Sequence, residues 1–293
     1  MDGRRTALVT GATSGLGRAA VGLLAATGDW RVLAGARDPG RGAQVAAELG
    51  AAAAVVEVDL ASLDSVRAAA ASVAATRAPL DALVLNAGVQ LPVADRASAD
   101  GYELTFAVNH LAHFVLTVEL LPHLAPGARV VVVSSGTHWG TWRKSGPFPA
   151  PRWADPRELA RPRRESGQRA YATSKLANVL FGAELARRHP EVDVAVLDPG
   201  LVPGTELHRS YPAPARAVYS GLAPLLARLP FASTPERAAA VLAAAVTGPP
   251  GTSGRYLERG AEAPSSPASR DPARARELWE ASEELTRPQT SAS

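Results

Sequence analysis

The stretch that decides the fold runs from Thr6 to Gly17 and reads TALVTGATSGLG. It opens with a short apolar run, which predicts a buried strand, and continues into a glycine turn with the spacing G-x-x-x-G-x-G. An alanine-rich helical pattern follows over residues 18–26. Strand, glycine turn and helix in this order predict a phosphate-binding loop, because glycines let a pyrophosphate approach the backbone and the helix offers free N–H groups. The alternative is a glycine turn that serves tight packing alone.

Strand and helix patterns alternate along the rest of the chain. We expect further strands over residues 31–35, 53–58, 80–85, 129–133, 192–197 and 255–257, and helices over residues 62–76, 99–124, 170–188 and 234–246. This rhythm predicts an α/β fold, a doubly wound parallel sheet of the Rossmann type in a single domain. The domain is expected to span residues 1–262. A linker and a C-terminal helix, within residues 263–293, are expected to pack on the same domain.

Polar or glycine residues follow four of the predicted strands, and ligands of such sheets bind beyond the carboxyl ends of the strands. These residues are Gly11, Arg37, Asp59 and Asn86. An arginine after the second strand accommodates the 2′-phosphate of a dinucleotide, so Arg37 favours NADP(H). Asp38 leaves NAD open, because an acid at this strand end bonds the ribose 2′-hydroxyl. The other role for Asp38 is to cap the helix that starts at the following proline.

Composition narrows the function classes. The 293 residues are 46% hydrophobic, carry a net charge of +3 and include no cysteine, which excludes disulfides, thiolate catalysis and cysteine-bound metals. No basic run is interleaved with aromatic residues, so no nucleic-acid partner is expected. No uninterrupted apolar run reaches about 20 residues, so we expect no membrane segment and a cytoplasmic location. His110 and His113 lack a third ligand, which favours packing over a metal site.

The pentad YATSK, from Tyr171 to Lys175, places a phenol and an ammonium four residues apart. In a helix these positions share one face, so the two side chains can meet. A free tyrosine titrates near about 10, and a neighbouring ammonium lowers that pKa toward the range in which acid–base catalysis works at neutral pH. The pattern alone is weak, because such pairs occur on many ordinary helix surfaces.

Taken together, the motifs resemble the short-chain dehydrogenase/reductase family. The resemblance is carried, in order, by TGATSGLG at Thr10–Gly17, Asp59-Leu60, Asn86-Ala87-Gly88, Asn109, Ser135, YATSK at Tyr171–Lys175 and Pro199-Gly200. Within the family, DGYELTFAVNHLAHFVLT, YATSKLANVLF and RELWEASEEL are similar to the retinol-dehydrogenase and protochlorophyllide-reductase neighbourhood. Neither specific activity is expected. The chain has no cysteine of the kind the light-driven reductases use, and no membrane anchor of the kind often found in retinoid enzymes.

The resemblance implies a role for each matching residue. Tyr171 is expected to donate or accept the proton, and Lys175 to lower the pKa of Tyr171 and bond the nicotinamide ribose. Ser135 is expected to hold the substrate oxygen, with Ser134 as the alternative, and Asn109 to hold a water that links Lys175 to solvent. The implied NADP(H) contacts are Gly11, Thr13, Ser14, Gly15, Leu16, Gly17, Arg37, Asp59, Leu60, Asn86, Ala87, Gly88, Tyr171, Lys175, Pro199, Gly200 and Thr205.

The stretch between Ser135 and Tyr171 is the main departure from compact family members. The two residues are 36 positions apart, and residues 137–169 are rich in tryptophan, proline and arginine. We expect this insert, together with residues 201–229, to form the walls of an apolar substrate pocket. The alternative is a surface excursion that serves contact between subunits, since homo-oligomers are common in the family.

These features predict an NADP-dependent oxidoreductase. Its expected substrate is a carbonyl or secondary alcohol of a fairly large apolar or aromatic small molecule. The alternative is a non-catalytic NADP-binding sensor or scaffold of the same fold, although such a protein has no need for the complete catalytic set. A sugar-nucleotide epimerase or dehydratase, which shares the Tyr-x-x-x-Lys pattern, ranks third because its glycine spacing usually differs.

Overall fold

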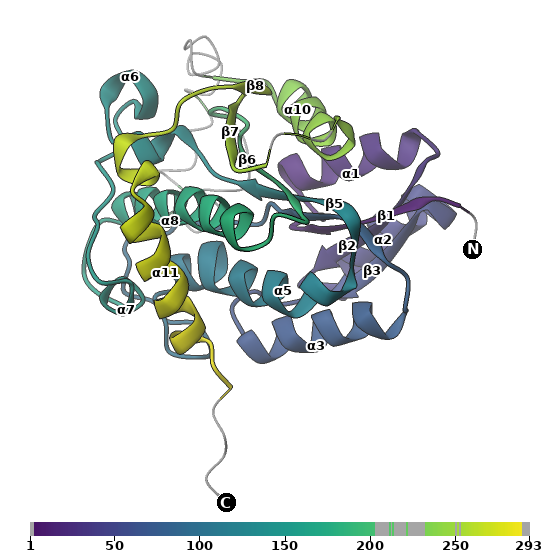
Figure 1. The fold of residues 1–293 in the computed structure, drawn as a ribbon, viewed down its shortest axis with the longest axis horizontal. Helices are drawn as coiled ribbons and strands as arrows, with labels where there is room; N and C mark the ends of the chain where they lie inside the picture. Colours follow the sequence, from purple (N-terminus) through teal and green to yellow (C-terminus); the bar gives the residue numbers. More distant parts are fainter. Residues whose placement is uncertain are drawn as a thin grey trace, which may run out of the picture.

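A mixed β-sheet forms the middle layer of the protein (Figure 1). The structure is a computed structural model that describes residues 3–202, 211, 213, 221, 232–249, 251 and 253–288. Within these residues the sheet has eight strands in the order β3-β2-β1-β4-β5-β6-β7-β8, all parallel except β8. The strands are β1 (Arg5–Thr10), β2 (Trp30–Ala36), β3 (Ala53–Glu57), β4 (Leu80–Leu85), β5 (Leu124–Val133), β6 (Asp193–Asp198), β7 (Arg255–Glu258) and β8 (Ala261–Glu262).

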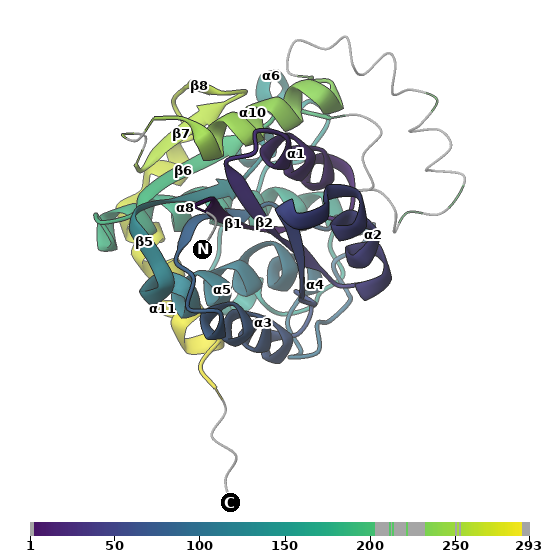
Figure 2. The same ribbon diagram turned by 90° about the vertical axis from the view of Figure 1, so that its right-hand side faces the viewer.

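Helices cover both faces of the sheet, which confirms the predicted doubly wound fold (Figures 1 and 2). One face carries α1 (Gly15–Ala26), α2 (Pro39–Leu49) and α10 (Pro235–Thr247), and the other carries α3 (Leu63–Ala75), α5 (Ala112–Leu120) and α8 (Gly167–Arg188). The strands of the sheet are apolar on both sides because both sides are buried. The strands between the edge strands β3 and β8 therefore contribute to two separate hydrophobic cores; in β4, Leu83 lies on one side and Val84 on the other.

The helix predicted over residues 99–124 is wrong at its start. The helical run begins with α4 (Leu104–Phe106), passes through a π-helical turn (Ala107–Leu111) and continues as α5. Residues 98–102 form a turn instead, closed by the Ser98 N–H, which donates to the Tyr102 carbonyl at 2.7 Å. The carboxylate of Glu103 then accepts the first free N–H groups of the run, which fixes where the helix starts.

Residues 104–123 are also the only helical run in the described part of the chain that is long and apolar enough to span a bilayer. This statement rests on length and composition alone, and 78% of the run is buried inside the protein. Phe106, Leu111 and Phe114 lie in the hydrophobic core that α3 and α8 share. The apolar character of this run is thus used in the packing of the fold.

The insert between Ser135 and Tyr171 contains three short helices that its sequence pattern does not reveal. They are a 3-10 helix (η4, Gly136–Trp139), α6 (Trp142–Ser145) and α7 (Pro156–Leu159). None exceeds one turn or so, which is too short for a 3.6-residue periodicity to be recognised. The caps are local, since the Asp155 carboxylate accepts the N–H of Arg157 at 2.8 Å.

The C-terminal helix α11 (Pro272–Leu285) packs against α8 and α7 (Figure 1). Trp279 stands edge-on to Phe114, with ring centroids 5.0 Å apart, and stacks on Phe181 at 6.0 Å. The Ser282 hydroxyl lies 2.9 Å from Nε2 of the buried His110. These contacts place residues 272–285 on the same hydrophobic core as the sheet.

Candidate active site

A pocket of about 1080 Å³ opens at the carboxyl ends of the parallel strands. It is lined by every predicted site residue except two. The residues in its lining are Gly11, Thr13, Ser14, Gly15, Leu16, Gly17, Arg37, Asp59, Leu60, Asn86, Ala87, Gly88, Ser135, Tyr171, Lys175, Pro199 and Gly200. Asn109 lies directly behind the lining, and Thr205, like most of residues 201–229, lies outside the described residues.

The glycine turn after β1 is shaped by two different needs. Gly11 and Gly15 have φ angles of +67° and +52°, a region that residues with a Cβ adopt at a cost. A Cβ on Gly17 would lie 2.3 Å from the Gly11 carbonyl oxygen, so this position must be glycine for the turn to close. A Cβ on Gly15, by contrast, would meet no protein atom within 4 Å, so the space beside it belongs to the pocket.

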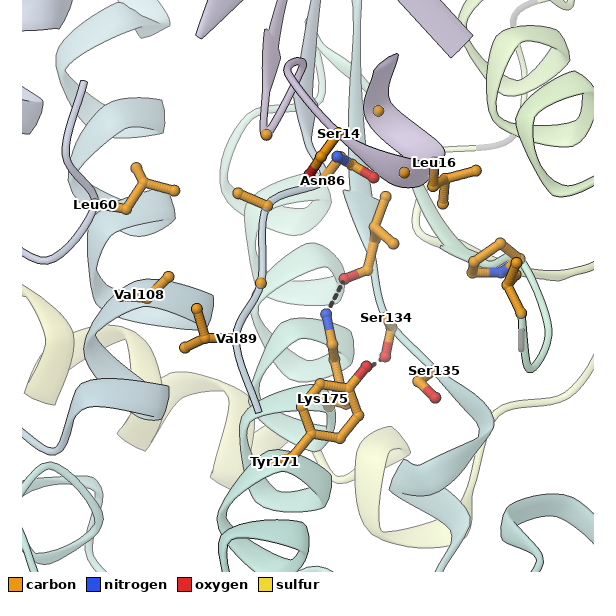
Figure 3. A pocket seen from close by; sticks show the side chains of 18 of the residues that line it. Ser14, Leu16, Leu60, Asn86, Val89, Val108, Ser134, Ser135, Tyr171 and Lys175 are labelled. Carbon is orange, nitrogen blue, oxygen red and sulfur yellow. Dashed lines mark hydrogen bonds between the residues drawn. The ribbon is translucent and has the colours of Figure 1, made fainter. Parts of the chain in front are cut away.

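The N-terminus of α1 faces the pocket without a side-chain cap. Ser14 occupies the N-cap position, and its hydroxyl makes no capping bond. Figure 3 shows Ser14 and Leu16 at the upper edge of the pocket, next to Asn86. The first N–H groups of a helix need an acceptor, and an anionic group is the acceptor they favour. This turn therefore fits a dinucleotide pyrophosphate.

Thr10, at the end of β1, fixes the neighbouring strand end. Its hydroxyl oxygen accepts the N–H groups of Asn86 and Ala87 at 2.9 and 3.0 Å, and its carbonyl accepts the Asn86 side-chain amide at 2.9 Å. The same hydroxyl lies 3.0 Å from Nε2 of His113, whose Nδ1 lies 3.1 Å from the carbonyl of Asn109. Since that carbonyl can only accept, Nδ1 carries the proton and Nε2 accepts from Thr10.

Burial keeps His113 neutral. Burial lowers the pKa of His113 to about 3, and the nearby charge of Lys175 acts in the same direction, whereas the bond to Asn109 opposes it. From the sequence, His110 and His113 are expected to serve packing or hydrogen bonding. In the described residues, no group of three His, Asp or Glu side chains could hold a metal. His113 instead joins the end of β1 to the helix that carries Asn109.

The end of β2 presents arginine to the pocket. Arg37 and Arg41 both belong to the pocket lining, and the guanidinium group is well suited to bind phosphate. Asp38 is used as a helix cap, because its carboxylate accepts the N–H groups of Gly40 and Arg41 at 2.9 and 3.2 Å. The Asp38 side chain thus serves the capping role that the sequence left open. Arg41 was not predicted as a site residue from the sequence, although it follows Arg37 by four positions.

Asp59 and Leu60 line the far end of the pocket, after β3. The Asp59 carboxylate accepts the N–H of Ala61 at 3.0 Å, while its own N–H donates to the Ser65 hydroxyl at 2.9 Å. Leu60 and Val108 stand on the side of the pocket away from Tyr171 (Figure 3). This end of the pocket offers an apolar surface and a turn fixed by hydrogen bonds, which suits the planar base of a dinucleotide.

Tyr171 and Lys175 lie side by side on α8, as their spacing predicts (Figure 3). Both are buried, and the Lys175 Nζ lies 5.5 Å from the centroid of the Tyr171 ring. The Lys175 ammonium donates to the carbonyl of Val133 at 3.0 Å. Asn178 donates to the same carbonyl at 3.1 Å and was not identified from the sequence. Burial lowers the pKa of Lys175 to about 8, and the charge of Asp198 opposes this shift.

Asn109 sits on the π-helical turn and uses its whole side-chain amide within the protein. Its Nδ2 donates to the carbonyl of Val89 at 3.1 Å and to the hydroxyl of Ser174 at 3.0 Å, and its Oδ1 accepts the Val89 N–H at 2.8 Å. Both amide hydrogens are therefore occupied. Asn109 thus attaches the chain after β4 to α8, the helix that carries Tyr171 and Lys175.

The two serines after β5 differ in what they bond. The buried Ser134 hydroxyl donates to the Lys175 carbonyl at 2.8 Å, so its proton is committed to the protein. The Ser135 hydroxyl oxygen accepts the N–H of Thr137 at 3.3 Å, which leaves its proton for another acceptor. Of the two serines, only Ser135 is partly exposed, and its hydroxyl proton makes no hydrogen bond within the described residues.

The end of β6 meets the end of β5 across a buried polar group. The Asp198 carboxylate accepts the N–H of Gly200 at 2.8 Å and the hydroxyl of Tyr256 at 3.1 Å, and burial raises the pKa of Asp198. The Tyr256 ring lies 5.1 Å from that of His138, whose Nδ1 lies 2.7 Å from the Ser135 carbonyl. This chain of contacts links Ser135 to Gly200, and both residues line the pocket.

The insert contributes to the pocket through a stretch without any tryptophan. Lys144, Ser145, Pro147 and Phe148 line the pocket, whereas Trp139, Trp142 and Trp153 do not. Trp142 is 74% exposed, and Trp153 packs at the edge of the core that α11 shares. The insert thus lines the pocket through residues 144–148, and the aromatic ring that it brings to the lining is that of Phe148. The other pocket residues that sequence reasoning missed include Arg96, Glu258 and Arg259.

Comparisons with known proteins agree with this geometry. The profile of the short chain dehydrogenase family matches residues 5–149. Protochlorophyllide reductase B of Oryza sativa subsp. japonica is 36% identical, over 96% of this chain and 77% of its own length. Polyprenol dehydrogenase of Mus musculus is 40% identical, over 94% and 82%. Retinol dehydrogenase 14 of Mus musculus is 37% identical, over 95% and 85%.

Among solved structures, an uncharacterized protein from Mycobacterium Paratuberculosis is similar along nearly the whole chain. It is 32% identical, with a TM-score of 0.66, and the match covers 96% of this chain and 93% of that one. This match covers much more of the chain than residues 5–149, which the family profile matches. The comparisons thus confirm the predicted resemblance, including its retinol-dehydrogenase and protochlorophyllide-reductase neighbourhood.

Proposed function

The chain belongs to the short chain dehydrogenase family, and on that premise we propose that it is an NADP(H)-dependent oxidoreductase acting on a carbonyl or secondary alcohol. The observation that carries the proposal is a single pocket that joins the glycine turn and Arg37 at one end to Tyr171 and Lys175 at the other. A nucleotide-binding scaffold explains the first end and gives no reason for the second.

The ends of β1 to β4 and the end of β6 would hold NADP(H). The uncapped N-terminus of α1 would bind the pyrophosphate, and Arg37 with Arg41 would bind the 2′-phosphate. Lys175 and Gly200 would contact the nicotinamide riboside. When bound, the nicotinamide supplies a hydride for reduction or accepts one in oxidation.

The residues of α8 and β5 manage the proton and the developing charge. In reduction, the substrate carbon gains a hydride and Tyr171 donates a proton to the oxygen, so that C=O becomes CH–OH. In oxidation, Tyr171 takes that proton back. A protonated Lys175 stabilises negative charge on the Tyr171 oxygen, and its pKa of about 8 keeps it mainly protonated at neutral pH. The Ser135 hydroxyl donates to the substrate oxygen, which orients the carbonyl.

We propose a fairly large apolar or aromatic molecule as the substrate. The end of the pocket beside Tyr171 has an apolar lining, which is made of Pro147 and Phe148 of the insert and of Leu201 and Val202 after β6. The relatives named above are, by their names, enzymes of polyprenol, retinol and protochlorophyllide. These names support a bulky substrate and do not select one.

The test is NADPH oxidation across ketones and aldehydes of graded size. We expect turnover that rises from small alkyl ketones to larger apolar or aromatic ones, with NADPH preferred over NADH. A protein that binds NADPH tightly and oxidises it with no member of the panel, and reduces NADP⁺ with none of the corresponding alcohols, would be a sensor or scaffold of the same fold.

A further inference from the structure

The part of the insert that reaches the pocket is a short stiff segment, residues 148–152, with the sequence FPAPR. Phe148 at its first position lines the pocket, and Arg152 at its last position lies against α8. The two prolines between them have fixed φ angles, and each restricts the residue before it to an extended conformation. The position of Arg152 therefore determines the position of Phe148 closely.

Arg152 is attached to the helix that carries the pentad YATSK. The hydroxyl oxygen of Thr173 accepts the Arg152 N–H at 2.9 Å, and the same hydroxyl donates to the Arg152 carbonyl at 3.2 Å. Thr173 is buried, with 2% of its surface exposed, so the two bonds are shielded from water. A single side chain in the middle of the pentad thus satisfies both backbone groups of Arg152.

A second contact holds the middle of the segment. Gly140 has a φ angle of +62°, and a Cβ on it would lie 2.6 Å from the Cα of Ala150 and 2.9 Å from the Cδ of Pro151. Only glycine allows the two stretches to approach this closely. The segment is therefore fixed at its end by Thr173 and along its length by Gly140.

The result of these contacts is an aromatic ring beside the proposed acid–base residue. The ring centroids of Phe148 and Tyr171 are 6.2 Å apart, with 49° between the planes. A substrate oxygen that accepts a proton from Tyr171 brings the group next to its carbonyl close to Phe148. Aromatic rings at such distances attract one another beyond the burial of their surface.

We propose that Phe148 selects substrates with an aromatic or other planar conjugated group next to the reacting carbonyl, and that Thr173 is the positioning residue that holds Phe148 there. This inference rests on the proposed function and names its substrate class. Phe148 contacts the substrate directly. Thr173 acts only through segment 148–152.

The experiment compares acetophenone with 2-octanone, two ketones of equal carbon number, in steady-state NADPH oxidation. The wild type is expected to favour acetophenone by about tenfold in kcat/KM, a ratio set by the aromatic contact. Phe148→Ala reduces that preference to about twofold or less. Thr173→Val lowers it about fivefold, through KM for acetophenone, with kcat for 2-octanone unchanged. Thr173→Ser keeps the hydroxyl and restores the wild-type preference.

The matched control is Trp142→Ala, which removes an exposed aromatic ring of the same insert and is expected to change nothing. The NADPH dissociation constant is measured for every variant and is expected to stay the same. The proposal is overturned if Phe148→Ala keeps the preference, or if Thr173→Ser behaves like Thr173→Val.

Failure of the proposed function is distinguished by a second readout. If neither ketone is turned over, the dissociation constants of both are measured on the NADPH-loaded protein, wild type and Phe148→Ala. A preference for acetophenone that depends on Phe148 supports the binding role even without turnover. Equal affinities, or a preference that survives Phe148→Ala, contradict it.

Discussion

The half of the pocket at the ends of β1 to β4 is built mainly from residues that directly follow neighbouring strands, whereas the half beside β5 and β6 depends on segments that arrive from elsewhere in the chain. In the first half, Thr10 and Asn86 are fixed by bonds between neighbouring strand ends. In the second, Phe148 lies beside Tyr171 at the start of segment 148–152, which is attached to Thr173 and packs against Gly140.

The two halves of the pocket therefore differ in how far their residues can change. A turn built of glycine backbone tolerates few changes, because its shape is the binding site. A wall carried by an inserted segment can change its side chains while Tyr171 and Lys175 stay in place. Any atom added to the glycine turn of the cofactor half is therefore expected to weaken NADPH binding. Changes of single side chains in the substrate half are expected to alter turnover or substrate preference.

The largest expected effect separates two neighbouring serines of the substrate half. Ser135→Ala removes a donor to the substrate oxygen and should lower kcat by about 100- to 1000-fold, as for an oxyanion-hole donor. Ser134→Ala removes a bond to the Lys175 carbonyl and should cost much less turnover. Steady-state kinetics with saturating NADPH measure both. If Ser134→Ala is the more damaging change, the assignment of the two serines is reversed.

In the cofactor half, the sharpest change is one methyl group at Gly17. Gly17→Ala places a Cβ 2.3 Å from the Gly11 carbonyl oxygen. Overpacking of this kind costs about 1–3 kcal/mol, and we expect the NADPH dissociation constant to rise about 30-fold. The control is Gly22→Ala in the same helix, where a Cβ meets nothing within 4 Å. That change should stabilise the protein by about 0.5–1 kcal/mol and leave NADPH binding unaltered.

Arg37→Ala tests the choice between the two dinucleotides. Loss of a phosphate contact should weaken NADPH about tenfold and leave NADH unchanged. Arg31→Ala serves as the control, because Arg31 is an exposed arginine of β2, the strand that Arg37 follows, and lies outside the pocket lining. Titration of each protein with both dinucleotides measures the ratio. Equal losses for NADPH and NADH in Arg37→Ala would rule out a phosphate contact.

The smallest effect concerns His113, which connects the two halves through Thr10 and Asn109. Burial lowers the pKa of His113 to about 3, below its value near 6.5 in an unfolded chain. The unfolded state therefore binds the proton more readily, and stability falls as the pH drops below about 6.5. Each such histidine should contribute about 1 kcal/mol of this loss by about pH 6.

Urea unfolding of the wild type and His113→Gln, at neutral pH and near pH 6, measures this loss of stability on acidification. His110 and His138 have lowered pKa values for the same reason, burial, so the variant should keep part of the acid sensitivity. An identical loss in both proteins would show that His113 is not neutral in the fold.

The fold and the cofactor half could be predicted from the sequence because their signals are local. Strand periodicity, the glycine turn and Arg37 each depend on a few consecutive residues, and Tyr171 and Lys175 depend on one helical spacing. Phe148 has no such signal. Its place in the pocket depends on Thr173 and Gly140, which are 25 and 8 positions away and act by tertiary contact.

The missed residues follow the same rule. Asp198 and Tyr256 meet only because β6 and β7 are neighbours in the sheet. The start of the helical run at Leu104 depends on the Glu103 carboxylate and on the turn before it. The spacing of apolar residues indicates neither of these features. The assignment that the sequence made to Thr205 lies outside the described residues and stays a prediction.

The most direct test of the central claim is NADPH binding and turnover in Tyr171→Phe, measured beside the wild type on the same carbonyl substrate. We expect an NADPH dissociation constant within about twofold of the wild type and a loss of turnover of at least about 100-fold. Tyr102→Phe, which removes a tyrosine hydroxyl bonded to the Leu285 carbonyl outside the pocket, should keep full turnover. Wild-type turnover in Tyr171→Phe would contradict the account.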